Sequence, residues 1–243
     1  MPQGWPGRTS SCNNVGMCGR YTVRSIQPVA ELFGISLPPQ FQPRYNVAPT
    51  QDVLVVRASA RDDVQRVTLR RGDMLRWGLV PSWADDPAVG NRMINARAET
   101  AADRPAFRDA MKRRRCLIPA DGFYEWQKQE GSKRKQPYLI HMKGDRPFAF
   151  GGLWEWWRRG DERLETVTIL TTSPNELVAP IHDRMPVIVK PDDFDRWLDP
   201  SVGAGDVADL LKPYPAEEME AGPVGLNVNN PANDDPSCAE AWK

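Results

Sequence analysis

The stretch Cys116-Leu117-Ile118-Pro119-Ala120-Asp121-Gly122-Phe123-Tyr124-Glu125-Trp126 decides the expected fold. It contains two apolar runs, residues 116–119 and 123–127, on either side of an Asp-Gly pair. Short runs of aliphatic and aromatic residues, bounded by Pro, Asp and Gly, are typical of β-strands that end in tight turns. The stretch therefore predicts two short strands.

Similar patterns continue on both sides of this stretch. Residues 52–58 and 64–70 are rich in β-branched side chains and are separated by a polar turn, which predicts a hairpin. Further strands are expected at residues 74–80, 137–142, 148–154, 166–171 and 187–189. Residues 128–136 are expected to form an exposed hairpin loop, and residues 214–223 a surface excursion before one last strand.

Helices are expected at residues 25–33, 102–114, 175–178, 192–198 and 207–211. The third has a readable start, with Ser173 as N-cap, Pro174 at the first helical position and Glu176 completing a capping box. No internal repeat is present. We expect one α+β domain over residues 17–235, dominated by an antiparallel β-sheet or barrel with a few short helices.

Composition limits the classes of protein that fit. With 243 residues, 40% of them hydrophobic and nine of them tryptophan, the chain can bury a sizeable core, which excludes a disordered protein. Residues 1–16 are expected to be an unstructured N-terminal extension, and residues 236–243 a C-terminal tail. The apolar runs are too short to span a bilayer, and residues 1–16 lack the apolar centre of a secretory signal. We therefore expect a cytoplasmic protein with no membrane partner.

The cysteines and histidines show no pattern of a metal site. Four cysteines are scattered without a CxxC motif, and the two histidines have no Cys or His partner at zinc-ligand spacing. These residues are Cys12, Cys18, Cys116, Cys238, His141 and His182. The sequence therefore predicts no metal and no cofactor, and disulfides are not expected in the reducing cytosol.

The net charge of zero conceals an asymmetry between the two halves of the chain. Residues 1–146 contain 24 Lys and Arg against 14 Asp and Glu, whereas residues 147–243 contain 8 against 18. A basic half is typical of a protein with an anionic partner. Mutual neutralisation of the halves within the fold accounts for the same numbers equally well, and the charge alone does not decide between these interpretations.

Five short sequence words contain most of the residues suited to chemistry. They are Met17–Tyr21 (MCGRY), Arg44–Thr50 (RYNVAPT), Arg76–Trp83 (RWGLVPSW) followed by Asn95–Thr100 (NARAET), Cys116–Trp126 (CLIPADGFYEW) and Ile181–Pro186 (IHDRMP). Alone, Cys18 would more often be a small buried apolar residue than a nucleophile, and Glu125 a strand carboxylate in an ion pair. In this order and over Met17 to about Asp235, the words resemble the SRAP family, the "SOS response-associated peptidase" domain.

The resemblance implies a DNA-repair protein that senses abasic sites in single-stranded DNA. It also implies junctions of single-stranded and duplex DNA as substrates, a monomer, and association with the nucleoid in a bacterium. In the family the initiator Met is removed and the exposed Cys, here Cys18, becomes the first residue. A ring-opened abasic sugar is an aldehyde, and an α-amine with a reference pKa of about 7.7–8.0 condenses with it. The thiol of the same residue then closes a thiazolidine ring, a covalent crosslink that shields the site from strand breakage.

The resemblance also implies roles for individual residues. The catalytic residues are Cys18, Glu125 as proton-transfer group, His182 as an aid to sugar ring opening, and Asn46 as a hydrogen-bond partner near the cysteine. The implied DNA contacts are Arg20, Asn95, Arg97, Thr171, Arg184, Trp83 and Pro49. The first five suit the DNA backbone, which positions the strand without reading its sequence. Trp83 and Pro49 suit packing against bases beside the lesion.

The residues before Met17 depart from the family pattern, because with them Cys18 has no free amine. Translation from Met17, peptide-bond cleavage before Cys18 and a chain inactive in crosslinking are the alternatives, and we favour the first. Two other functions stay open. One is a thiol autopeptidase or amide hydrolase using Cys18, His182 and Asn46. The other is a noncovalent reader of modified or single-stranded DNA.

Overall fold

The computed structural model describes residues 18–62 and 67–242. Five strands close into a barrel in the order β10–β4–β3–β6–β9 and back to β10. They are β3 (Asp52–Asp62), β4 (Val67–Trp77), β6 (Arg115–Ala120), β9 (Phe148–Arg159) and β10 (Glu162–Thr172). Neighbouring barrel strands are antiparallel except β4 and β10, which pair in parallel over two residues each.

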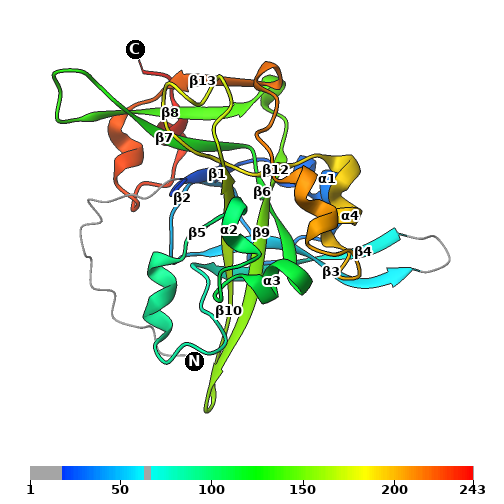
Figure 1. Cartoon of the computed structure of the whole chain (residues 1–243). Coiled ribbons are helices and arrows are strands. Elements are labelled where there is room, and N and C mark those ends of the chain that lie inside the picture. The colour runs from blue at the N-terminus through cyan, green and yellow to red at the C-terminus, as the bar shows by residue number, and fades with distance from the viewer. Residues whose placement is uncertain (1–17, 63–66, 243) are drawn as a thin grey trace.

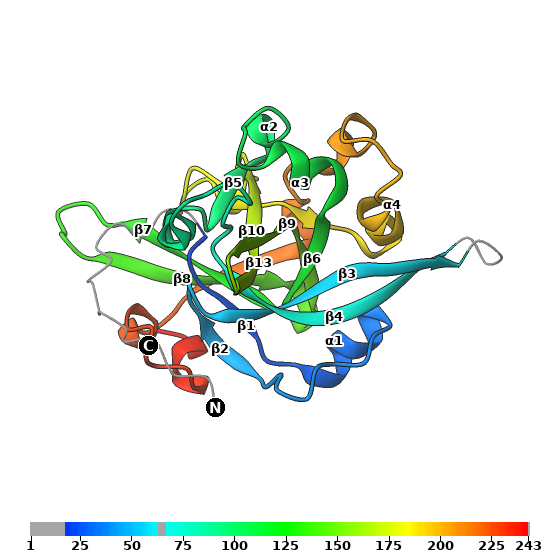
Figure 2. The same cartoon turned by 90° about the horizontal axis from the view of Figure 1, so that it is seen from below.

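A second, five-stranded sheet packs against the barrel (Figure 1). Its order is β13 (Met219–Pro223), β8 (Lys135–Met142), β7 (Gly122–Lys128), β1 (Tyr21–Val23) and β2 (Arg44–Val47). Barrel strand β6 leads directly into β7, so the stretch 116–126 connects the two sheets. The β3–β4 and β7–β8 hairpins project from opposite sides of the molecule (Figure 2).

Short elements complete the fold. Strands β5 (Asn95–Arg97) and β11 (Met185–Pro186) pair with β10, and β12 (Ile188–Val189) pairs with β9. The helices are α1 (Ile26–Phe33), α2 (Ala98–Ala101), α3 (Arg108–Arg113) and α4 (Phe194–Leu198). Short 3-10 helices lie at Pro87–Arg92, Lys143–Asp145, Pro191–Asp193, Gly205–Leu210, Ala216–Glu218, Leu226–Asn229 and Pro236–Ala239. Within the described residues, no helix is both long and apolar enough to cross a membrane.

Aromatic side chains join the sheets in one core. Tyr21 of β1 meets Trp77 and Phe150 edge to face, with ring centroids 5.5 and 5.6 Å apart. All three side chains are almost completely buried. Edge-to-face pairs of this kind add about 0.5–1.5 kcal/mol beyond the area that they bury. Tyr21 therefore fixes the chain that immediately follows Cys18 against the barrel.

The predicted fold class is confirmed: the protein is mainly antiparallel sheet with a closed barrel and few short helices. The hairpin expected from residue 52 forms as β3 and β4, with residues 64–66 outside the described part of the chain. The separate strands expected at 64–70 and 74–80 are wrong, because β4 runs unbroken to Trp77. Its polar residue Asp73 stays in register opposite Val55 and is neutralised by Arg57 at 2.8 Å.

The predicted helix 102–114 is too long, since only Arg108–Arg113 is helical. Pro105 explains the late start, because it lacks an N–H and its ring clashes with a helical backbone before it.

The helix predicted at 175–178, with Ser173 as its cap, is also wrong. Asn175 instead accepts the N–H of Val178 through Oδ1 (3.0 Å) and closes a single turn. The predicted surface excursion is wrong as well, since residues 219–223 are strand β13.

Candidate functional site

Strands β1 and β7 bring Cys18 and Glu125 together. The pairs Tyr21–Phe123 and Thr22–Gly122 set an antiparallel register, and the N–H of Tyr124 donates to the carbonyl of Arg20 (3.0 Å). The chain before Tyr21 therefore runs beside Glu125. The backbone nitrogen of Cys18 donates to Oε1 of Glu125 over 2.7 Å.

Glu125 sits in surroundings that disfavour its charge. Its side chain is 3% exposed, and burial raises its pKa to about 8, although the hydrogen bond from the Cys18 nitrogen opposes this shift. A carboxyl group with a pKa near 8 is present in both protonation states at neutral pH. It can therefore both accept and donate a proton at the Cys18 nitrogen.

His182 lies on the other side of Glu125, with Nε2 3.9 Å from Oε2. His182 ends a turn that begins at Val178, and its backbone N–H donates to the carbonyl of Val178 (2.9 Å). The N–H of Arg184 donates to Nδ1 (3.2 Å), so the neutral ring carries its proton on Nε2, which faces Glu125. Burial lowers the pKa of His182, opposed by the charge of the exposed Asp183, whose Oδ1 is 3.0 Å from Nδ1. The lowered pKa favours the neutral ring.

The Cys18 side chain is fully buried at the centre of this cluster. Burial, and after it the charge of Glu125, raises the pKa of the thiol well above its ordinary value. The sulfur is therefore a protonated thiol at neutral pH. The backbone of Cys18 is left-handed, with φ of 44°, which is uncommon for a residue other than glycine.

Asn46 is buried but is occupied by other partners. The two hydrogens of its Nδ2 are shared among three backbone carbonyls, those of Val228 (3.2 Å), Asn230 (3.0 Å) and Asn233 (2.8 Å). Its Oδ1 accepts from Nη1 of Arg20 (3.1 Å). These contacts fix the segment 228–233 beneath the site, so Asn46 acts as a support of the fold.

The residues predicted to contact DNA fall into two groups. Arg97 and Trp83 are exposed, Trp83 by 63%, and Pro49 and Asn95 are partly exposed. Asn95 Nδ2 also reaches the carbonyl of Cys18 at 3.5 Å, which ties β5 to the site.

The second group is engaged inside the protein. Arg20 is buried and donates to the carbonyl of Val228 (2.7 Å) as well as to Asn46. Thr171 is fully buried, with Oγ1 3.5 Å from the carbonyl of Ala96. Arg184 is mostly covered and forms a two-pronged ion pair with Glu99 at 2.5 and 2.6 Å.

Two residues at the site were not identified from the sequence. Gln127, two positions after Glu125 on β7, donates to the carbonyl of Pro180 (3.0 Å) and ties that strand to the turn before His182. Side chains alternate along a strand, so Gln127 lies on the same face as Glu125. This alternation could have identified Gln127 from the sequence. Lys135 of β8 lowers the pKa of both Glu125 and His182 by its charge. Lys135 follows the β7–β8 loop, so its distance in sequence from Glu125 did not reveal that it lies near the site.

No group of three or more His, Cys, Asp or Glu side chains in the described residues is arranged to hold a metal ion. The chemistry that this arrangement supports is proton transfer at the Cys18 nitrogen and sulfur. His141 lies outside this arrangement and is partly exposed, with Nδ1 3.1 Å from the carbonyl oxygen of Met142.

A closed barrel with a second sheet that holds a cysteine nitrogen against a buried carboxyl group defines a class of protein, and comparison with known families identifies it. The profile described as "SOS response associated peptidase (SRAP)" matches residues 17–231. The chain belongs to the SRAP family.

Relatives with more specific names are similar over most of the chain. "Abasic site processing protein YoqW" of Bacillus subtilis is 43% identical over 231 residues, covering 93% of this chain and all of that protein. "Abasic site processing protein HMCES" of Gallus gallus is 34% identical, covering 82% of this chain and 66% of the longer relative. A crystal structure of a Bacteroides thetaiotaomicron protein superposes with a TM-score of 0.80 at 26% identity, covering 93% of this chain and all of that one.

Proposed function

We propose that this protein processes abasic sites in single-stranded DNA by forming a thiazolidine crosslink through Cys18 as first residue. The names of the relatives support abasic-site processing. The observation that carries the mechanism is the 2.7 Å contact between the Cys18 nitrogen and the buried Glu125 carboxyl group. A free amine in this position would have a proton acceptor in direct contact.

The reaction balances as a condensation. The neutral amine of Cys18 adds to the aldehyde of the opened sugar, and the hemiaminal loses one water to give an imine. The thiol then adds across the C=N bond: sulfur bonds to carbon, and the thiol proton ends on nitrogen. Glu125 accepts the ammonium proton, returns a proton to the departing hydroxyl and relays the thiol proton. The raised pKa of Glu125 suits this exchange, because it lies near that of an α-amine.

His182 is proposed to act on the sugar. Its Nε2–H faces Glu125, so the pair can protonate the ring oxygen while a proton leaves the anomeric hydroxyl. Opening the ring in this way exposes the aldehyde. The neutral form of His182 is favoured by its lowered pKa, which keeps it available for proton exchange near pH 7.

For DNA, we propose direct contacts by the side chains that are open to solvent. Arg97 would bind phosphate, and Trp83 and Pro49 would pack against bases. Arg184 would bind phosphate by exchanging its Glu99 partner. Arg20 and Thr171 would position the site from within.

A thiol peptidase is less well supported. Such an enzyme needs a thiolate, and burial keeps the Cys18 thiol protonated. It also needs a group that orients the histidine, whereas the Asn46 side chain binds three carbonyls and Arg20.

The test uses protein that begins at Cys18 and protein that keeps residues 1–17. Each is incubated with single-stranded DNA that carries an abasic site and is then run on a denaturing gel. We expect a shifted band only with a free Cys18 amine. Its intact mass should equal protein plus DNA minus one water.

Matched variants decide the chemistry. Cys18→Ser keeps the amine but loses the thiol, so its adduct should require borohydride trapping of the imine. Cys238→Ser changes another buried cysteine and should leave the crosslink intact. A stable crosslink formed by Cys18→Ser, or by the chain with residues 1–17 attached, would refute the proposal.

A further inference from the structure

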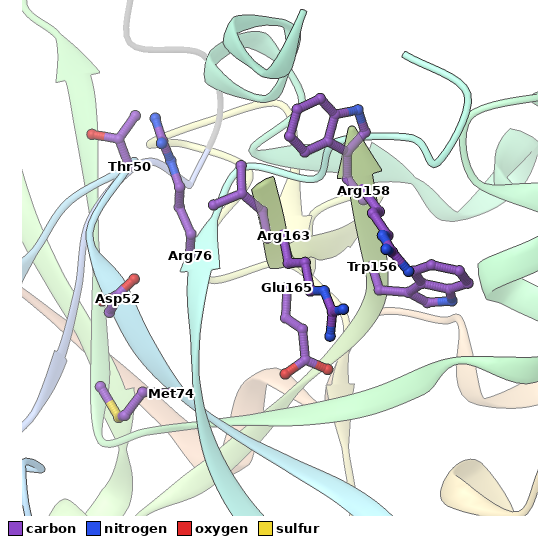
Figure 3. Close-up of a pocket in the computed structure, with 10 residues that line it drawn as sticks. Thr50, Asp52, Met74, Arg76, Trp156, Arg158, Arg163 and Glu165 are labelled. Atoms are coloured by element: carbon purple, nitrogen blue, oxygen red, sulfur yellow. The ribbon is translucent and has the colours of Figure 1, made fainter. Parts of the chain in front are cut away.

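A groove of about 720 Å³ opens beside β10, outside the cluster around Cys18 (Figure 3). Strands β4 and β10 pair only at Arg76–Trp77 and Thr166–Val167, and the groove includes residues on both strands next to this short pairing. Its lining is formed by Thr50, Asp52, Met74, Arg76, Trp156, Trp157, Arg158, Arg163, Leu164 and Glu165. This volume lies in the range of pockets that hold a small organic ligand.

Positive charge exceeds negative charge in the lining of this groove. Arg158 of β9 lies directly opposite Arg163 of β10, and like charges at such positions destabilise a sheet. Among the described residues, neither these two arginines nor Arg76 forms an ion pair. Arg76 and Arg158 instead donate to Asn91 Oδ1 and the carbonyl of Gly160, both at 3.2 Å. An anion bound in the groove would reduce the repulsion between the exposed side chains of Arg158 and Arg163.

The two carboxylates in the lining leave this excess in place. Glu165 is paired with the buried Arg57 at 2.6 Å. The other partner of Arg57, Asp73, is also paired with Arg71 at 3.0 Å, so these two arginines and two carboxylates balance one another. Asp52 lies opposite Arg76 in the β3–β4 ladder and balances one arginine. Two positive charges remain for a ligand.

Trp156 adds a flat apolar surface to the groove. Its side chain is 53% exposed, whereas Trp154, two residues earlier on the same face of β9, is covered by Arg57 at 4.3 Å from its ring. An exposed indole ring beside arginines is the combination that binds single-stranded nucleic acid, through base stacking and phosphate contacts.

The groove continues from residues already proposed to contact DNA. Thr50 in its lining follows Pro49 directly. Trp157, also in the lining, donates through Nε1 to the carbonyl of Ala84 (2.7 Å), the residue after Trp83. A strand held at Pro49 and Trp83 would therefore lie next to the groove.

We propose that this groove binds a nucleotide of the single strand that flanks the lesion. Its base stacks on Trp156, and its phosphates lie between Arg76, Arg158 and Arg163. The assignment rests on the proposed function only in naming that strand as the ligand.

The experiment measures noncovalent binding of lesion-free single strands from about 4 to about 16 nucleotides, the range of known site sizes. Fluorescence anisotropy should show a step in affinity once the strand reaches the groove. Trp156→Ala should weaken binding of the long strands about tenfold and leave that of the short strands unchanged. Arg163→Glu should act likewise.

Controls carry the same chemical change at sites outside the groove. Trp242 is also 53% exposed, and Trp242→Ala should leave the step unchanged. Arg146→Glu matches the charge change of Arg163→Glu on an exposed side chain. An affinity step that survives both Trp156→Ala and Arg163→Glu would overturn the proposal.

Two further measurements distinguish the flanking strand from a free nucleotide as ligand, and the groove from the crosslinking site. Binding of a free nucleoside monophosphate that depends on Trp156, without any effect of strand length, would overturn the assignment to the flanking strand. Crosslinking to abasic DNA is measured separately. If the wild-type protein forms no crosslink, the proposed function is refuted. If it forms the crosslink but shows no step in affinity with strand length, only the proposed role of the groove is refuted.

Discussion

Glu125 ionises in surroundings that oppose its charge, so its protonation is coupled to folding. Its pKa is about 8 in the folded protein, against an ordinary value of 4.5. The folded state therefore binds more protons than the unfolded state between these values, and stability falls as pH rises through that window. The contribution of the buried carboxyl group is fully present below about pH 4.5 and is lost by about pH 8.

Glu125→Gln removes this titration. We expect the free energy of unfolding of the wild type to fall relative to Glu125→Gln by up to a few kcal/mol between about pH 4.5 and 8. Urea unfolding of both proteins across this range measures the difference. Glu130→Gln, on the exposed β7–β8 loop, should show no such trend. A constant difference between wild type and Glu125→Gln would contradict the raised pKa.

The same substitution should slow crosslinking, because an amide cannot relay protons. A loss of about a hundredfold in rate is typical of a removed general acid or base. Single-turnover rates with abasic DNA at pH 7 provide the measurement. An unchanged rate would show that Glu125 only positions the amine.

At the scale of elements, Asn46 links β2 to the segment 228–233. Its side-chain amide contacts the three carbonyls of Val228, Asn230 and Asn233 and accepts a hydrogen bond from Arg20. Asn46→Ala should lower the free energy of unfolding by about 3 kcal/mol, because buried polar groups lose their partners. Asn227→Ala is the matched control, since the exposed Nδ2 of Asn227 only reaches Ser237 Oγ (3.1 Å). Equal stability of the two variants would contradict the structural role of Asn46.

Elements with regular patterns were predictable from the sequence, and those set by distant contacts were not. The hairpin from residue 52 followed from its β-branched residues and polar turn. The continuity of β4 did not, because Asp73 is tolerated only where Arg57 of β3 neutralises it. Gly78 ends β4 for a tertiary reason, since a Cβ there would lie 2.5 Å from the carbonyl oxygen of Gly90.

The site shows the same division. The family resemblance predicted Cys18, Glu125 and His182, and the structure brings these three together. The resemblance did not predict that Arg20 and Asn46 face inward, because a sequence motif does not define the direction in which each of its side chains points. Their partners, such as Val228, lie about two hundred residues away in sequence.

At the scale of the whole molecule, ion pairs join the basic and acidic halves of the chain. Arg57–Glu165, Arg70–Asp195 and Arg114–Glu155 each connect the two. Mutual neutralisation thus accounts for part of the charge asymmetry. Arg97 lies outside these pairs and is exposed, so it is available to a phosphate.

Arg97→Ala should weaken DNA binding and reduce its dependence on salt. Loss of one phosphate contact on a single strand lowers the slope of log affinity against log salt by about 0.7. Titrations at several salt concentrations, in a Cys18→Ala background that prevents crosslinking, measure this slope. Arg146→Ala is the control for loss of one exposed positive charge. Equal slopes for the two variants would contradict a phosphate contact by Arg97.

The left-handed backbone of Cys18 exists only while another residue precedes it, because a first residue has no φ angle. Such a conformation costs an L-residue roughly 1–2 kcal/mol. Removal of the preceding residues abolishes that torsional cost and leaves the contacts of β1 in place. If Cys18 becomes the first residue, as the proposed function requires, this change releases strain from the folded protein, and the shortened chain is the more relaxed form.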